Sequence, residues 1–275
     1  MARYEEIAQD LRVLITSGEY PPGAALPLMR DLAEQYGVSD ITMRRAYGLL
    51  TGEGLIESRG RSGTFVREHP DRLRLTVRTR QMERDELGYY SGPETQGWRP
   101  LQLPDGEQTQ VVTLLVPADI ADTLGVAPDT RLTVRRRLIG DPDVETHRQL
   151  ADSWLAPWVA EELPLLSGRT GLGGMYDRLE EWGSQPLQWR EEISARMPSP
   201  EEAAALVMPS TGVPLLRTLR ITYFAEAGPE RVAEVQDIRM SAAVFALGYP
   251  LPRGESARWP VEPATGDYYQ DPPEA

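Results

Sequence analysis

Apolar side chains recur at helical spacing in three consecutive segments near the start of the chain. In residues 4–16 they fall on one helix face, at Tyr4, Ile7, Leu11, Leu14 and Ile15. Residues 28–36 repeat the spacing at Met29, Leu32, Ala33 and Tyr36, and a third segment repeats it at Met43, Ala46, Tyr47 and Leu50. The pattern predicts three short amphipathic helices, with Gly37 ending the second and the Ser39 hydroxyl capping the third.

A hairpin is predicted directly after the third helix. Residues 55–58 and 64–66 read as strands, and the glycines of Arg59-Gly60-Arg61-Ser62-Gly63 permit a tight turn with two arginines at its tip. Three helices followed by a hairpin is the order of a winged helix-turn-helix, whose third helix enters the major groove of DNA with its first turn. We therefore expect residues 1–67 to form a DNA-binding domain.

The longer second part, residues 109–250, shows a mixed pattern of helices and strands. The predicted strands are 111–116, 131–139, 145–154, 188–196, 215–224 and 231–240, and the predicted helices are 118–124, 158–163, 174–182 and 200–206. The last two strands flank a short turn and are expected to form an antiparallel hairpin. The fold class expected for the whole chain is α+β, in two domains.

Two segments fall outside these domains. Residues 68–108 form a linker and the first segment of the second domain: 71–84 alternate arginines with apolar residues, and 88–108 read as a loop. The alternation fits either a basic stripe facing DNA or an anionic ligand, or an edge strand of the second domain. Residues 251–275 are rich in proline and acids, a composition that predicts disorder.

The composition limits the kinds of binding surface and reactive site that the chain can have. The net charge is −13 and all 29 basic residues are arginines, so a DNA-binding surface must gather its arginines on one side. The absence of cysteine excludes disulfides, thiolate metal sites and cysteine nucleophiles. No signal peptide or membrane span is apparent, and we expect a cytoplasmic protein without cofactor or metal.

The N-terminal segment resembles the DNA-binding domain of the GntR family of bacterial transcription regulators. The ordered pieces are Tyr4…Ile7-Ala8…Leu11, Gly18…Pro22-Gly23…Leu26-Pro27, Arg30-Asp31-Leu32-Ala33, Gly37-Val38-Ser39, Thr42-Met43-Arg44, Glu53-Gly54-Leu55 and Gly63-Thr64-Phe65-Val66. The resemblance implies DNA contacts from Arg30, Ser39, Asp40, Thr42 and Arg44, and from Arg59, Gly60, Arg61, Gly63 and Thr64 in the wing. Arg45 is either a further DNA contact or a surface or interdomain residue.

Two residues depart from this family's pattern. Leu28 stands where the family usually has a serine that caps the second helix, and leucine cannot accept a hydrogen bond from a backbone N–H. Asp40 stands where the family most often has an arginine that reads guanine. Aspartate can instead accept a hydrogen bond from cytosine N4, or simply favour the helix N-terminus through the dipole.

The second part resembles the UTRA domain, which marks the HutC branch of the same family and is similar to chorismate lyase in fold. The matching pieces are Val116-Pro117…Ile120-Ala121…Leu124-Gly125, Arg135-Arg136-Arg137-Leu138, Gln149 to Leu155, Gly173-Gly174-Met175-Tyr176…Leu179, Ala195-Arg196-Met197-Pro198 with Glu201-Glu202-Ala203…Leu206, Arg220…Tyr223, and Glu234…Asp237. The resemblance implies an antiparallel sheet with helices and a small-molecule effector site.

The effector contacts carry over to this chain only in part. They fall on Arg137, Tyr176 and Glu234, with Asp237 beside the last. A second family arginine falls on Ile139 and a hydroxyl residue falls on Gly174, which argues against a phosphosugar.

Three functions remain open at this stage. The first is a homodimeric regulator, expected to be a repressor, that binds a palindromic double-stranded DNA operator and responds to a small-molecule effector. The second is an effector-independent regulator of the plasmid-transfer type. The third is a chorismate lyase-like enzyme, which the presence of only His69 and His147 and the unexplained wing disfavour.

Overall fold

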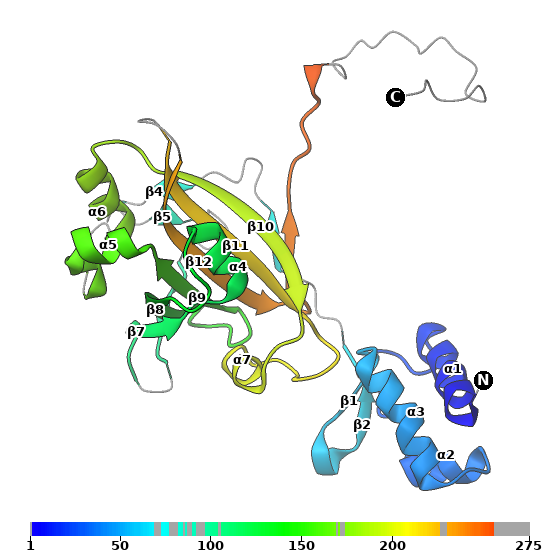
Figure 1. Ribbon diagram of the computed structural model, residues 1–275. Helices are drawn as coiled ribbons and strands as arrows, with labels where there is room; N and C mark the ends of the chain where they lie inside the picture. Colours follow the sequence, from blue (N-terminus) through cyan, green and yellow to red (C-terminus); the bar gives the residue numbers. More distant parts are fainter. Residues whose placement is uncertain are drawn as a thin grey trace, which may run out of the picture.

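The structure is a computed structural model that describes residues 2–68, 73–76, 82–84, 86, 90–91, 97–103, 106–168, 170, 174–225 and 230–255. Gly173, three arginines of the expected basic stripe (Arg72, Arg78 and Arg80) and the tail from residue 256 onward lie outside these ranges. Figure 1 shows an N-terminal unit, here called the head (residues 2–68), beside a larger C-terminal domain built on one sheet.

The head has the predicted winged helix-turn-helix order. It consists of α1 (Arg3–Thr16), α2 (Met29–Gln35), α3 (Asp40–Gly52), β1 (Ile56–Ser58), the 3₁₀ turn η1 (Gly60–Ser62) and β2 (Thr64–Val66). The helices bury the predicted apolar stripes, and Ile7, Leu11, Leu32, Met43 and Leu50 are almost completely inaccessible. Strands β1 and β2 pair antiparallel, and Ala25 adds a bridge to Phe65, which ties the wing to the helices.

The C-terminal domain is organised on a seven-stranded antiparallel sheet with the order β10-β11-β12-β9-β8-β6, in which β7 also pairs with β8. The strands are β6 (Arg99–Leu101), β7 (Gln110–Leu115), β8 (Arg131–Gly140), β9 (Arg148–Leu155), β10 (Gln188–Arg196), β11 (Leu215–Phe224) and β12 (Arg231–Ser241). The predicted hairpin of β11 and β12 is confirmed, with a register shift at Thr222 and Tyr223.

Helices cover the two faces of this sheet in different places. On one face, α4 (Ala118–Leu124) packs on Val134, Trp154 and Val235, and α7 (Pro200–Ala205) leads into Leu206, which packs on Leu138, Leu150 and Leu215. We call this the α4/α7 face. On the other, α5 (Pro157–Glu162), the 3₁₀ helix η3 (Pro164–Ser167) and α6 (Gly174–Gly183) pack on Leu155 and Phe224. We call this the α5/α6 face.

The expectation that residues 88–108 form only a loop was wrong in detail. Residues 99–101, predicted as loop, form β6 and pair with β8 at the edge of the sheet, where Pro100 is tolerated because an edge strand leaves one side of its backbone without partners. Residues 73–76 form β3 (Leu73–Thr76), which is no edge of the large sheet: it pairs in parallel with β13 (Phe245–Gly248) in a separate two-stranded sheet. Strands β4 (Glu83–Arg84) and β5 (Tyr90–Ser91) form another small pair.

Candidate DNA interface and effector site

The third helix presents its first turn to solvent. Ser39 caps it as predicted, because its Oγ accepts a hydrogen bond from the Thr42 backbone N–H at 3.3 Å and lies 3.1 Å from Thr42 Oγ1. Asp40, Arg44 and Arg45 are exposed and lie outside the buried stripe of the helix. The structure therefore leaves these predicted DNA-contacting residues accessible to solvent.

Helix α2 begins at Met29, one residue after the start of the predicted segment 28–36. Leu28 occupies the N-cap position, makes no side-chain capping hydrogen bond and is 61% exposed. Arg30 follows in the first turn with its side chain 81% exposed, and its nearest acid is Asp31 at 3.4 Å. A pair this exposed contributes little stability, so Arg30 is available to a phosphate.

The two arginines of the wing have different surroundings. The Arg59 guanidinium donates to Glu57 Oε1 at 2.7 Å and lies 4.7 Å from the centre of the Phe65 ring. Arg61 lies in the exposed turn between Gly60 and Gly63, whose φ angles are +59° and +109°. Thr64 follows, partly buried, at the start of β2. Arg59 is thus already held by groups of the wing, whereas Arg61 stands at the tip.

The candidate effector site lies on the α5/α6 face and centres on Glu234, which is completely buried. Thr222 donates from Oγ1 to Glu234 Oε2 at 2.9 Å and lies 3.4 Å from the Tyr176 hydroxyl, so β11, β12 and α6 meet here. Burial and the nearby Glu234 raise the pKa of Tyr176. Within the described ranges, Glu234 Oε1 has no hydrogen-bond partner. A buried carboxylate oxygen that receives no hydrogen bond favours a ligand that donates one.

Two arginines approach the same face from β8. Arg137 donates from Nη2 to Ser153 Oγ at 2.8 Å, and its buried Nε has no partner among the described residues. Arg135, two residues earlier on the same strand, donates from Nη1 to the carbonyl oxygens of Leu166 and Gly168, both at 2.6 Å. Burial and the neighbouring Arg137 lower the pKa of Arg135, and Glu234 opposes this shift.

Three aromatic rings pack together beside Glu234. Tyr90, Tyr176 and Trp189 have centroids 5.5–5.8 Å apart, and the Tyr90 hydroxyl donates to Glu180 at 2.9 Å. Burial and the Glu180 contact raise the pKa of Tyr90 to about 12. Sequence reasoning missed Arg135, Tyr90 and Trp189. The alternation of Arg135 with Arg137 could have revealed the first, but the two aromatics come from segments whose approach no local pattern indicates.

Asp237 does not belong to this site. It lies three residues from Glu234 on β12, and side chains an odd number of residues apart point to opposite faces of a strand. Arg217 donates to both of its carboxylate oxygens, at 2.9 and 3.0 Å, on the α4/α7 face. The expectation that Asp237 lies beside Glu234 in an effector site was therefore wrong.

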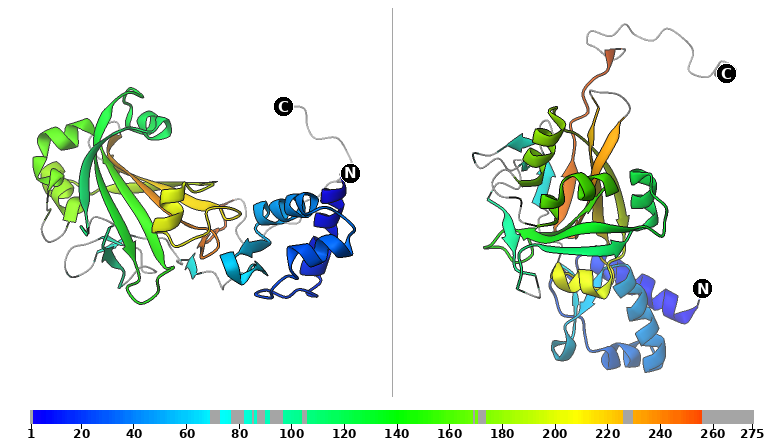
Figure 2. Two further views of the ribbon diagram at one scale, coloured as in Figure 1. Left: turned by 90° about the horizontal axis from the view of Figure 1, so that it is seen from below. Right: turned by 60° about the vertical axis from the view of Figure 1, so that its left-hand side comes forward.

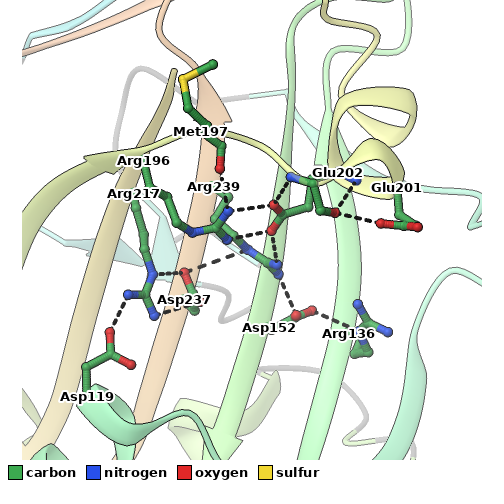
Figure 3. A network of polar contacts seen from close by, with 11 residues as sticks. Asp119, Arg136, Asp152, Arg196, Met197, Glu201, Glu202, Arg217, Asp237 and Arg239 are labelled. Atoms are coloured by element: carbon green, nitrogen blue, oxygen red, sulfur yellow. Dashed lines mark hydrogen bonds and ion pairs between the residues drawn. The ribbon is translucent and has the colours of Figure 1, made fainter. Parts of the chain in front are cut away.

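Asp237 is instead part of a charge network on the α4/α7 face (Figure 3). Glu202 of α7 accepts hydrogen bonds from Arg239 at 2.8 Å and from both terminal nitrogens of Arg196 at 2.6 Å. Arg239 also bonds to Asp152, which Arg136 approaches at 3.3 Å, and Arg217 joins Asp237 to Asp119 of α4. The network ties both helices of this face to the central strands.

The loop after α7 contacts the head. The backbones of Gly54, which follows α3, and Gly212 pack so closely that a Cβ on Gly212 would overlap the Thr51 carbonyl oxygen. Arg67 is buried beside this contact, with Nη2 3.4 Å from the Thr211 carbonyl oxygen and Nε 3.6 Å from Glu57. In both views of Figure 2 the yellow segment around α7 lies next to the head.

The described part of the chain contains no group of three or more histidine or acidic side chains arranged to hold a metal ion. It also contains no helix that is long and apolar enough to cross a membrane.

Comparison with protein families gives two matches. Residues 3–66 match the model described as bacterial regulatory proteins, gntR family, and residues 104–243 match the UTRA domain. The two matched ranges correspond to the head and to most of the C-terminal domain.

Individual proteins extend this similarity over both domains. An HTH-type transcriptional regulator of Streptomyces coelicolor is 31% identical over 212 residues, which cover 74% of this chain and 77% of that protein. The HTH-type transcriptional repressor NagR of Bacillus subtilis is 27% identical over 223 residues, 80% of this chain and 84% of NagR. A crystal structure of a GntR-family transcriptional regulator, 26% identical, superposes with a TM-score of 0.61 and covers 92% of this chain and 99% of that one.

Proposed function

Because the chain belongs to the GntR family of bacterial transcription regulators, in the branch that carries a UTRA domain, we propose that it is a dimeric repressor released from a palindromic operator by a small polar effector. The α3 helices of two copies would enter successive major grooves about 34 Å apart. The likeness to the repressor NagR supports the sign of regulation. Binding, rather than catalysis, is the activity that this proposal assigns to both domains.

The effector chemistry follows from the α5/α6 face, and the buried Glu234 carboxylate is the observation that carries the proposal. Its Oε1 calls for a hydroxyl or amine donor, whereas the free Nε of Arg137 calls for an acceptor. The neighbouring rings of Tyr90, Tyr176 and Trp189 offer stacking surfaces to a ring-shaped ligand. Arg135 is engaged by two carbonyl oxygens, so one arginine rather than two faces the ligand, which favours a polyol, amino sugar or hydroxy acid over a phosphate ester.

The response would reach the head through the shared strands. Along β9 and β12, the effector-side residues Ser153 and Gln236 alternate with the network residues Asp152 and Asp237. Glu202 fastens α7 to that network, and the loop after α7 carries the Gly212 contact to the head. These contacts would have two conformations, and a ligand that binds one of them more tightly would shift the distance between the two heads.

The test uses the full-length protein and an operator selected from random DNA fragments. Polyols, amino sugars, hydroxy acids and sugar phosphates are screened by thermal shift, and hits are titrated into the protein–operator complex while fluorescence anisotropy is recorded. The expected hit raises the melting temperature and releases the operator, and Glu234→Gln abolishes both effects. Glu192→Gln, an exposed carboxylate on β10, is the matched control and should respond like the wild type.

Two outcomes contradict parts of this proposal. If no compound stabilises the protein or releases DNA, the chain is an effector-independent regulator. If Glu234→Gln responds normally to a hit, the ligand binds elsewhere. Sedimentation of the operator complex tests the dimer separately, because two copies on one operator are expected.

A further inference from the structure

The first turn of α3 contains an exposed apolar residue that neither the hydrogen-bonding pattern nor the core explains. Ile41 is the second residue of the helix, and 69% of its surface is accessible. It lies on the outward side, because Ile41, Arg44, Arg45 and Gly48 follow helical spacing opposite the buried stripe. Single exposed apolar residues are common on protein surfaces, so the place of Ile41 in the turn that would face a major groove, and not its exposure alone, points to a partner outside the chain.

Its neighbours indicate what that partner is. Ile41 stands between Asp40 and Thr42, in the turn that reaches the base edges when a helix of this kind enters the major groove. Asp40 and Thr42 offer hydrogen-bonding groups, whereas Ile41 offers only methyl and methylene groups. Among the groups that base pairs present in the major groove, the thymine C5-methyl is the apolar one that such a side chain recognises.

The rest of the same helix face allows the approach that this contact needs. One and two turns further along lie Arg44 and Gly48, the latter without a side chain. A Cβ at Gly48 would meet no other atom within 4 Å, so packing inside the described head does not require glycine there. A glycine inside an exposed helix costs about 1 kcal/mol relative to alanine. Its presence on the outward face is consistent with a helix that comes close to DNA along its length.

We propose that Ile41 is a specificity-determining residue that packs against the methyl group of one thymine in each operator half-site. With Asp40 as a hydrogen-bond acceptor beside it, the first turn reads a base donor and a methyl group instead of the guanine edge that an arginine would read. This inference rests on DNA binding by the head and is independent of the effector response proposed above.

Deoxyuridine provides a direct test because it differs from thymine in the duplex only by the missing methyl. After the operator has been selected with the full-length protein, each thymine of the half-site is replaced in turn by deoxyuridine, and dissociation constants are measured by anisotropy without effector. One thymine per half-site should weaken wild-type binding by about three- to tenfold, the range expected for one buried methyl group. Ile41→Ala should weaken binding to the natural operator by a similar factor and lose sensitivity at that thymine alone.

Val13→Ala is the matched control, since Val13 is a β-branched residue of the head, 52% exposed, on α1 rather than α3. It should keep the wild-type response at every thymine, and thermal melting should show both variants folded. The proposal is overturned if no thymine replacement affects the wild type, if the selected half-site holds no invariant thymine, or if Ile41→Ala remains sensitive at the same position. None of these results depends on whether an effector exists.

Discussion

At the scale of single residues, Asp40 sets the base preference that we expect of the recognition helix. Its carboxylate cannot donate to guanine O6 or N7 but can accept from cytosine N4. Asp40→Arg should therefore shift the preference toward guanine at one position per half-site and steepen the salt dependence of binding, since a negative charge is replaced by a positive one. Selection of operators with wild type and variant measures the shift.

Arg44→Ala serves as the comparison for this prediction. Arg44 is exposed one turn after Asp40, and its loss should cost about 1–3 kcal/mol of binding on all sequences without changing the preferred one. If the operators selected with Asp40→Arg match those of the wild type, Asp40 serves only the helix dipole, and base reading at this step lies with its neighbours.

The residues that sequence reasoning placed correctly depend on local geometry. Ser39 caps α3, and Arg44 and Arg45 in its second turn are exposed, because helical spacing determines both. Asp237 was misplaced because the sequence places it close to Glu234, although strand alternation sends the two to opposite faces. Tyr90 was missed because its approach to Tyr176 depends on the path of a segment 86 residues away in sequence, for which the alternation of apolar and polar residues carries no signal.

At the scale of elements, α7 is held to the sheet by a charge network as well as by apolar contacts. Only six residues long, it begins with a Ser199–Glu202 capping box, and the Glu202 carboxylate also receives Arg196 and Arg239. Burial by itself would raise the pKa of Glu202, but the hydrogen bonds from Arg196, the Ser199 backbone and Arg239 lower it from 4.5 to about 2. The stabilisation by this carboxylate is complete above pH 4.5 and is lost as the pH falls toward 2.

This shift predicts how the acid stability of the protein changes with Glu202. The wild type should lose on the order of 3 kcal/mol between pH 5 and 2 from this group, and Glu202→Gln should be less stable at pH 7 but lose less over that interval. Urea unfolding at a series of pH values measures both. Glu161→Gln, an exposed carboxylate of α5, should follow the wild-type curve. Parallel curves for wild type and Glu202→Gln would mean that the network contributes nothing at this position.

The elements that were predicted and those that were not differ in length and in context. Strands β10 and β11 and helix α4 have the predicted bounds because each contains at least seven residues with a clear period. Strand β6 has three residues, including Pro100, and it exists because β8 offers an edge rather than because its own sequence favours extension. The pairing of β3 with β13 joins residues about 170 positions apart, which a local pattern cannot indicate.

At the scale of the whole molecule, the contact between Gly54 and Gly212 fixes how the head lies on the C-terminal domain. Gly212 has φ +71°, and a Cβ there would overlap the Thr51 carbonyl oxygen. Gly212→Ala should therefore separate the loop after α7 from the head while both domains stay folded. Gly125→Ala is the matched control: Gly125 has φ +66° and a Cβ there meets nothing within 4 Å, so it carries the same backbone strain without the contact.

The chain's lack of cysteine makes this prediction measurable, because introduced cysteines are the only labelling sites. Spin labels at Glu34→Cys on α2 and Glu161→Cys on α5, both exposed, report the distance between the two domains. The distance distribution should be narrow in the wild type and in Gly125→Ala but broad in Gly212→Ala. If Gly212→Ala keeps the narrow distribution, the contact does not position the head, and the route from the effector site through α7 is excluded. If it broadens, the same variant in the operator-release assay should bind DNA yet respond weakly to effector, because the head no longer follows α7.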